Sequence, residues 1–227
     1  MPDDILLIDK PAGWTSFDVV AKIRGYIRRQ YVEKDEKPTK RQLRVGHAGT
    51  LDPFATGLLI ILLGDGTKKA GEFLKLDKVY EATFRLGETS NTGDPEGEIT
   101  AVSDIVPTKK AVLEALEGFK GEITQVPPTF SAIKVNGVRA YKLAHKGQDV
   151  EIPSRQVTIY GIELLDYSYP EVKIRTHVSS GTYIRTLGED LGKVLGTGAY
   201  CSQLRRTKIA DYDIANAKTL DEAMTDA

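Results

Sequence analysis

Residues 46–53 read Gly46-His47-Ala48-Gly49-Thr50-Leu51-Asp52-Pro53, and this stretch is the densest chemical signal in the chain. The two glycines allow a tight backbone and the close approach of a ligand. Pro53 biases Asp52 away from helix, towards an extended or turn conformation. The apolar run 58–63 follows and predicts a buried strand. Asp52 is therefore a carboxylate between a glycine-rich loop and an apolar strand, either a candidate for chemistry or an ordinary turn residue.

Periodic patterns surround this stretch on both sides. Upstream, residues 5–8 predict a short strand, and Thr15 or Ser16 predicts the cap of a helix over about 16–29. The polar residues 31–44 indicate a loop. Within it, residues 31–41 are either an added RNA-contacting loop or simply solvated and disordered, and we favour the second interpretation.

Downstream, alternation predicts strands at 80–86, around 157–165 and at 172–178. Thr108 predicts the cap of a helix that ends near Gly118, and Thr219 with Glu222 predicts a capping box for a last short helix. Ser180 or Thr182 predicts the cap of a helix over 183–195, with a buried stripe of Ile184, Leu187, Leu191 and Val194 and with Gly196 at its end. These elements, without strict βαβ alternation, predict an α+β fold with a mixed, largely antiparallel central sheet flanked by helices and loops.

Composition excludes several classes of protein. The chain has 227 residues, of which 41% are hydrophobic and 28% charged, so a wholly disordered or collagen-like chain is excluded. A single cysteine, Cys201, cannot form an internal disulfide, which fits a cytoplasmic location. No CxxC or HExxH motif is present, so a metal site built from Cys and His is not expected. The longest apolar run is too short to span a bilayer, and the acidic start is wrong for a secretory signal.

Basic residues are clustered although the formal net charge is −1. Residues 22–44 hold nine lysines and arginines against three carboxylates, and residues 134–155 hold five against two. Arg205, Arg206 and Lys208 add a third cluster. Such asymmetry can create a phosphate-binding face on a nearly neutral protein. An ordinary solvated surface explains the same counts equally well.

A second chemical signal is Ser179-Ser180-Gly181-Thr182-Tyr183-Ile184-Arg185. It places Arg185 in the first turn of a predicted helix, where a cation is disfavoured by the helix dipole. An anionic partner would explain this position, and a solvated surface arginine is the alternative.

Taken together, the motifs closely resemble the TruB family, the bacterial tRNA pseudouridine-55 synthases. The residues that carry the resemblance occur in the family's order and span about 5–209: Lys10-Pro11-x-Gly13-x-Thr15-Ser16, the stretch 46–53 with Ala55-Thr56-Gly57-Leu58-Leu59, Lys78-Val79-Tyr80, Ser180 to Arg185 with Asp190-Leu191-Gly192, and Leu204-Arg205-Arg206-Thr207.

The resemblance implies an isomerase that converts uridine to pseudouridine in the T-loop of tRNA, with no cofactor and no metal. By resemblance, Asp52, Tyr80 and Arg185 are catalytic, and Arg185 pairs with Asp52 and keeps it ionised. Tyr80 stacks on the flipped base and Leu204 lines the base pocket. The other residues expected in substrate binding are His47, which assists base extrusion, Lys10, which mainly supports the catalytic loop, Gly49, Thr50 and Tyr183.

The resemblance also implies that the aperiodic residues at about 124–153 form an insertion that grips the T-arm of tRNA and is mobile without RNA. The RNA-binding candidates are Lys134, Arg139, Tyr141, Lys142, His145, Lys146, Arg155 and Arg205. We expect a single catalytic domain without a C-terminal PUA domain, since few residues follow Leu204. We also expect a monomer in the cytoplasm that needs no protein partner and no membrane.

Two other functions compete with this one. The first is an RNA-binding or tRNA-folding protein with the same fold and no chemistry, against which the joint presence of Asp52, Tyr80 and Arg185 speaks. The second is a carboxylate hydrolase, which would need a second carboxylate as general acid. Asp94 and Glu96 are the weak candidates for that role. The residues leave open whether Asp52 attacks C1′ of the ribose or C6 of the base.

Overall fold

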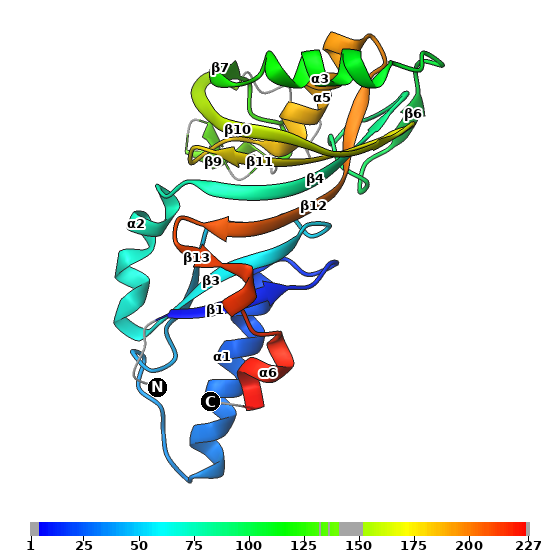
Figure 1. The fold of residues 1–227 in the computed structure, drawn as a ribbon. Helices are drawn as coiled ribbons and strands as arrows, with labels where there is room; N and C mark the ends of the chain where they lie inside the picture. Colours follow the sequence, from blue (N-terminus) through cyan, green and yellow to red (C-terminus); the bar gives the residue numbers. More distant parts are fainter. Residues whose placement is uncertain (1–4, 132, 136, 141–151, 226–227) are drawn as a thin grey trace. The chain divides into compact units, whose positions relative to one another are not determined.

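The computed structural model describes residues 5–131, 133–135, 137–140 and 152–225 (Figure 1). The chain divides into two compact units, which are described separately. The first comprises residues 1–80 and 205–227, and the second residues 81–204. The expectation of a single catalytic domain stays a prediction.

In the first unit, a small sheet is built around β3 (Thr56–Leu63). β1 (Ile5–Lys10) and β2 (Val45–Ala48) both pair with it in antiparallel fashion. β12 (Ala199–Ile209) runs parallel to it through Arg205 and Arg206, and β13 (Tyr212–Asp213) pairs with the end of β12. A parallel and several antiparallel ladders make this part of the sheet mixed.

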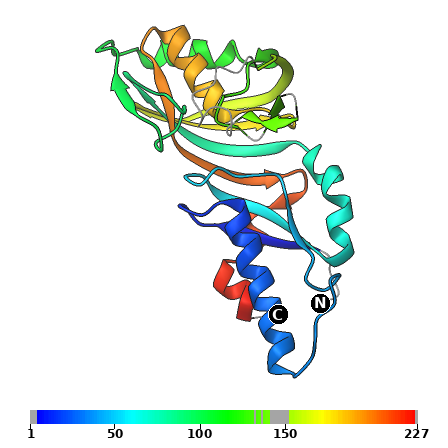
Figure 2. The same cartoon turned by 180° about the vertical axis from the view of Figure 1, so that it is seen from behind.

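Both faces of β3 are covered. Leu59, Ile61 and Leu63 face a core that they share with helices α1 (Ser16–Glu33) and α6 (Leu220–Thr225). Leu58, Ile60 and Leu62 face a second core, which contains Phe73 of α2 (Ala70–Leu74) and Ile209 of β12. Burial on both faces explains the continuous apolar run. Figure 2 shows α1 and α6 lying side by side.

Helix α1 begins where the sequence predicts. Thr15 accepts a hydrogen bond from the Asp18 amide, and the Asp18 carboxylate accepts one from the Thr15 amide, which is a capping box. The helix continues to Glu33, so the expectation that it ends near residue 29 is wrong. Tyr31 packs against the α1 core and extends the apolar face by one turn.

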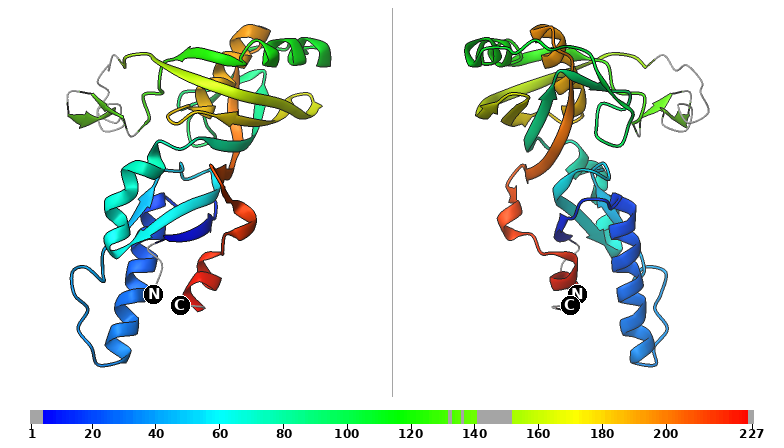
Figure 3. Two further views of the ribbon diagram at one scale, coloured as in Figure 1. Left: turned by 60° about the vertical axis from the view of Figure 1, so that its left-hand side comes forward. Right: turned by 90° about the vertical axis from the view of Figure 1, so that its right-hand side faces the viewer.

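In the second unit, the strands follow the order β12-β4-β11-β10-β7. Their bounds are Lys78–Leu86 for β4, Glu171–Val178 for β11, Arg155–Ser168 for β10 and Gly121–Gln125 for β7. Helices α3 (Lys109–Glu117) and α5 (Ile184–Leu195) contact each other (Figure 3). A Cβ on Gly188 of α5 would lie 2.6 Å from the Phe84 ring, so this glycine allows α5 to pack directly on β4.

Two short hairpins complete the second unit. β5 (Glu88–Ser90) pairs with β6 (Ile99–Ala101) across the turn at 91–97, and β8 (Lys134–Val135) pairs with β9 (Val138–Arg139). Short 3-10 helices span Gly64–Lys69 and Ile214–Asn216 in the first unit. Within the described ranges, no helix is long and apolar enough to cross a membrane.

The α+β fold is confirmed, but some strands were not predicted and two expectations about α5 are wrong. Strands β2, β7 and β12 were not predicted, because their mixed polar and small residues have no clear period of two. Val194 is 64% exposed and does not belong to the buried stripe of α5. The N-cap of α5 is Tyr183 and not Ser180 or Thr182, and its own side chain makes no capping hydrogen bond.

Candidate active site

The loop that carries Asp52 is held on both sides of that residue. On one side, the buried Ser16 hydroxyl donates to the Leu51 carbonyl (3.1 Å) and accepts from the Leu51 amide (2.8 Å). On the other side, the Lys10 ammonium donates to the Pro53 carbonyl (3.2 Å). Asp52 therefore sits between two anchored neighbours, which limits the backbone positions that its carboxylate can adopt.

Lys10 is fully buried and also donates to the carbonyls of Pro11 (2.8 Å) and Trp14 (2.6 Å). The Lys10 ammonium therefore links the turn after β1 to the Asp52 loop, as expected of a residue that supports this loop. The expectation that Lys10 also belongs to the substrate-binding set stays a prediction.

Arg206, which the sequence did not single out from its basic cluster, holds the same loop from within the first unit. It is 2% exposed, and its guanidinium donates to the carbonyls of Leu58 (2.8 Å), Gly49 (3.0 Å) and Thr50 (3.5 Å). A Cβ on Gly57 would lie 2.3 Å from the Arg206 carbonyl oxygen, so the two backbones touch. Its place in the motif Leu204-Arg205-Arg206-Thr207 was the available signal.

Tyr80 and Leu204 are almost completely buried, with 9% and 8% of their surfaces exposed. Tyr80 lies on the apolar face of β4, and Leu204 lies on β12. Each is the last residue before its strand passes from one compact unit into the other. His47 lies on β2 opposite Ile61 and precedes the Asp52 loop in the sequence. The roles of these three residues stay predictions.

Arg185 in the second unit has a buried anionic partner, Asp94. The two side chains are each 4% exposed and are joined by a 2.7 Å ion pair. The guanidinium also donates to the carbonyls of Thr92 (2.9 Å) and Phe130 (2.7 Å). The Asp94 carboxylate accepts two more hydrogen bonds, from the Thr92 hydroxyl (2.6 Å) and the Glu96 amide (3.0 Å).

This network explains a cation in the first turn of α5. The positive end of the helix dipole disfavours a cation there, and the Asp94 carboxylate offsets that effect. It also gives Asp94, a weak candidate for an acid in a hydrolase, a positioning role. Asp52 belongs to the first unit and Arg185 to the second, and their pairing stays a prediction.

The start of α5 is organised by Gln125 from β7. The Gln125 amide oxygen accepts from the Tyr183 backbone N–H (3.0 Å), and its amide nitrogen donates to the Tyr183 carbonyl (3.2 Å). The Arg155 guanidinium lies 4.6 Å from the centre of the Tyr183 ring and donates to the Gly181 carbonyl. Arg155, expected to bind RNA, therefore also shapes the surroundings of Tyr183.

The remaining RNA-binding candidates divide into three groups. Lys134 and Arg139 are cross-strand partners in the β8–β9 hairpin. Arg205 forms a bidentate ion pair with Asp9 (2.7 and 3.0 Å) and remains 40% exposed. Tyr141, Lys142, His145 and Lys146 lie outside the described residues, as does part of the segment expected to be mobile. Within the described part of the chain, no group of three or more His, Cys, Asp or Glu residues is arranged to hold a metal ion.

Comparisons with known proteins cover almost the whole chain. Residues 37–184 match the N-terminal domain of TruB family pseudouridylate synthases, and residues 185–226 match the C-terminal domain of tRNA pseudouridylate synthase B. A Phocaeicola vulgatus protein named tRNA pseudouridine synthase B is 46% identical over 219 residues, which are 96% of this chain and 90% of that protein. A Bacteroides fragilis protein of the same name is 47% identical over 213 residues, 93% of this chain and 88% of that one.

Among solved structures, a Cbf5-Nop10-Gar1 complex is similar, with a TM-score of 0.72 and 28% identity over 97% of this chain and 53% of that chain. Sequence identity over nearly the full length, two consecutive family domains and a shared fold agree with one another. The chain belongs to the TruB family of pseudouridylate synthases.

Proposed function

We propose that this pseudouridine synthase isomerises a uridine in the T-loop of tRNA, with Asp52 at the reacting centre. The observation that carries the choice of tRNA is the identity of 46–47% with curated relatives named tRNA pseudouridine synthase B. The class of reaction follows from the family, whose members are isomerases. T-loop specificity and the roles of individual residues are our proposals.

The reaction exchanges one bond for another without an external reagent. The N1–C1′ bond of the target uridine breaks, the uracil turns, and a C5–C1′ bond forms while C5 loses its proton and N1 gains one. An ionised carboxylate can begin this sequence by attack at C1′ or at C6. The anchored loop around Asp52 supports this role, because it holds the carboxylate in a narrow range of positions.

Arg185 provides the positive charge that keeps Asp52 ionised in a site closed to water. A guanidinium that is already held by Asp94 and two carbonyls needs little reorganisation during the reaction. Asp94 acts here as a positioning residue, since it contacts Arg185 and has no assigned contact with the substrate.

Tyr80, Leu204 and His47 act on the flipped base. The target uridine must leave the loop stack, which costs a few kcal/mol. The Tyr80 ring stacks on the extruded uracil, Leu204 lines its pocket and His47 assists the extrusion. Because an unperturbed phenol is a poor base at neutral pH, stacking is the role that we assign to Tyr80.

The enzyme binds the T-arm through its basic residues and acts as a monomer without a protein partner. The related Cbf5 chain was solved in a complex with Nop10 and Gar1, and that assembly is a property of the relative. For this chain, sedimentation of the purified protein at assay concentration checks the monomer. Turnover of a T-arm hairpin by the purified chain alone checks that no partner is needed.

The decisive experiment is tritium release from C5-labelled uridine in a T-arm hairpin. Wild type should release tritium, whereas Asp52→Ala and Asp52→Asn should be slower by roughly 1000-fold or more, as is typical when a nucleophile is removed. Asp104→Asn, an exposed aspartate of the second unit, is the control and should behave as wild type. Equal release by all four proteins would remove Asp52 from the mechanism. Hairpin binding without tritium release by wild type would instead favour an RNA-binding protein without chemistry.

A further inference from the structure

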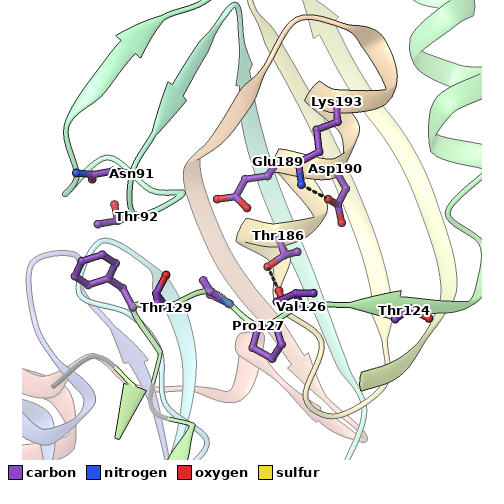
Figure 4. A pocket seen from close by; sticks show the side chains of 12 residues that line it. Asn91, Thr92, Thr124, Val126, Pro127, Thr129, Thr186, Glu189, Asp190 and Lys193 are labelled. Carbon is purple, nitrogen blue, oxygen red and sulfur yellow. Dashed lines mark hydrogen bonds and ion pairs between the residues drawn. The ribbon is translucent and has the colours of Figure 1, made fainter. Parts of the chain in front are cut away.

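The second unit contains a cavity of about 350 Å³ that none of the proposed catalytic roles uses. It lies between the turn at Asn91 and Thr92, the segment 126–130 and helix α5 (Figure 4). All of its lining residues belong to the second unit. Its volume falls in the range of pockets that bind small molecules or single nucleotides.

One wall of the cavity is apolar. It is formed by Val126, Pro127, Pro128 and Phe130, and Val126 keeps 57% of its surface exposed. Proline rings and a phenyl ring are surfaces on which a planar heterocycle can stack.

The opposite wall carries carboxylates. Asp190 is bound by the Lys193 ammonium (2.8 Å), whereas Glu189 has no hydrogen-bond donor among the residues that the structure describes. In Figure 4, the Glu189 side chain points from α5 towards the turn at Asn91 and Thr92. A Cβ on Gly93 would lie 2.4 Å from the Glu189 Oε1, so the carboxylate rests against the backbone of that turn. Burial raises the pKa of Glu189, and a donor entering the cavity would offset that effect.

We propose that this cavity binds a nucleobase of the substrate RNA that bears an exocyclic amino group, at a nucleotide other than the target uridine. The base stacks on the apolar wall and its amino group donates to Glu189. An ionised carboxylate can only accept hydrogen bonds, so the exocyclic amino group of cytosine, adenine or guanine is a suitable donor. Uracil has no amino group and offers only its ring N3–H, which lies elsewhere on the base. The charged lining residues sum to −1, which admits a neutral base and disfavours a phosphate. This inference rests on the proposed action on RNA.

The cavity shares two residues with the Arg185 network. Thr92 and Phe130 line the cavity, and their carbonyls accept hydrogen bonds from the Arg185 guanidinium. A base in the cavity therefore packs against the groups that position Arg185. Loss of that base should lower kcat as well as raise KM.

The test combines changes in the base with changes in the protein. In a T-arm hairpin, each loop nucleotide with an amino group is replaced in turn by its counterpart without one: cytidine by uridine, adenosine by purine riboside, guanosine by inosine. Affinity is measured by fluorescence anisotropy and kcat/KM by pseudouridine formation, for wild type, Glu189→Met and Glu189→Gln. Glu117→Gln, an exposed glutamate of α3, is the matched control. Thermal melting verifies that each variant is folded.

We expect one loop position at which removal of the amino group lowers the affinity of wild type for the hairpin about tenfold, as for the loss of a hydrogen bond to a charged group. The same base change should have no effect in Glu189→Met, a reduced effect in Glu189→Gln and the full effect in Glu117→Gln. The proposal is overturned if no loop position shows an amino-group effect on affinity that depends on Glu189. It is also overturned if every base change is neutral and spermidine, a polyamine, competes with the hairpin in a way that depends on Glu189. Binding is measured independently of turnover, so a wild type that binds and forms no pseudouridine would refute the proposed reaction and leave the cavity test intact.

Discussion

At the scale of single residues, the organisation of the site depends on buried cations that are held by partners distant in sequence. Arg185 is the clearest case, because its guanidinium serves Asp94 and two backbone carbonyls at once. The planar guanidinium presents its donors in a rigid fork, so it can meet a carboxylate and two carbonyls in fixed directions.

We therefore expect Arg185→Lys and Asp94→Asn to impair both stability and turnover. Asp94→Asn removes the anion and Arg185→Lys removes the fork geometry of this buried ion pair, and breaking such a pair should lower the free energy of unfolding by about 3 kcal/mol. Misplacement of the remaining group should lower kcat roughly 100-fold. Urea unfolding and single-turnover kinetics measure the two effects. Arg175→Lys, whose ion pair with Glu81 is exposed, is the control and should change neither quantity much. Wild-type kcat in Asp94→Asn would contradict the positioning role.

Lys10 invites a similar test within the first unit. Lys10→Met would leave three carbonyls without their donor, and we expect a loss of about 3 kcal/mol in unfolding free energy together with lower kcat. Lys22→Met, on the exposed face of α1, should lie within about 0.5 kcal/mol of wild type. Chemical denaturation followed by circular dichroism provides the measurement. A stability equal to that of Lys22→Met would show that the Asp52 loop does not depend on Lys10.

Glu189 should make stability depend on pH in a defined direction. Burial raises its pKa above the usual 4.5, so the folded protein holds this proton at pH values where the unfolded chain has lost it. Its contribution to stability is therefore complete below pH 4.5 and declines as pH rises through the raised pKa. Relative to wild type, Glu189→Gln should gain unfolding free energy as pH rises through this window.

Denaturation of both proteins at a series of pH values from 4 to 8 checks this expectation. A difference that stays constant over the whole series would contradict it. A carboxylate that reduces stability at neutral pH is consistent with a ligand-binding role for Glu189.

At the scale of elements, helix α5 shows how tertiary contacts replace a local cap. The side chain of the N-cap residue, Tyr183, makes no capping hydrogen bond. Instead, Gln125 of β7 fixes the Tyr183 backbone through hydrogen bonds with its N–H and its carbonyl. The first turn of α5 and its Arg185 are thereby tied to the edge of the sheet.

We expect Gln125→Leu to lower the unfolding free energy by about 1–2 kcal/mol and to lower kcat, because the first turn that carries Arg185 would fray. Gln156→Leu removes an exposed hydrogen bond to Thr124 on the same pair of strands and is the matched control. Hydrogen exchange at the amides of residues 183–187 measures this fraying directly. Unchanged protection there in Gln125→Leu would refute this account of the cap.

At the scale of the whole molecule, charge and chain connectivity matter most. The formal net charge is −1, so overall attraction to RNA is absent and binding must come from local basic clusters. Strands β4 and β12 each pass from one compact unit to the other, immediately after Tyr80 and Leu204.

Affinity for a T-arm hairpin should therefore depend steeply on salt. With about four phosphate contacts, we expect the affinity to fall roughly 100-fold between 50 and 200 mM salt. Replacement of Lys34 and Lys37 by Gln should leave the slope unchanged, since these exposed lysines belong to the segment that we interpret as solvated. A flat plot of log affinity against log salt would exclude electrostatic binding of the T-arm.

The sequence alone determined the elements that have a strong period and the family. Helices α1, α3 and α6 begin at the caps that the sequence predicts, and β1, β3, β4 and β11 occupy the predicted runs. Local hydrogen bonds and alternating burial act over a few residues, and such patterns can be read from the chain. Strands β2, β7 and β12 lack that pattern and exist because neighbouring strands pair with them.

Only the tertiary structure decided which groups hold the candidate catalytic residues. Asp94 lies 91 residues from Arg185, Gln125 lies 58 residues from Tyr183, and Arg206 lies 157 residues from Gly49. No local pattern links such pairs, because a buried charge or a helix end is satisfied by whichever polar group the packed sheet brings near it.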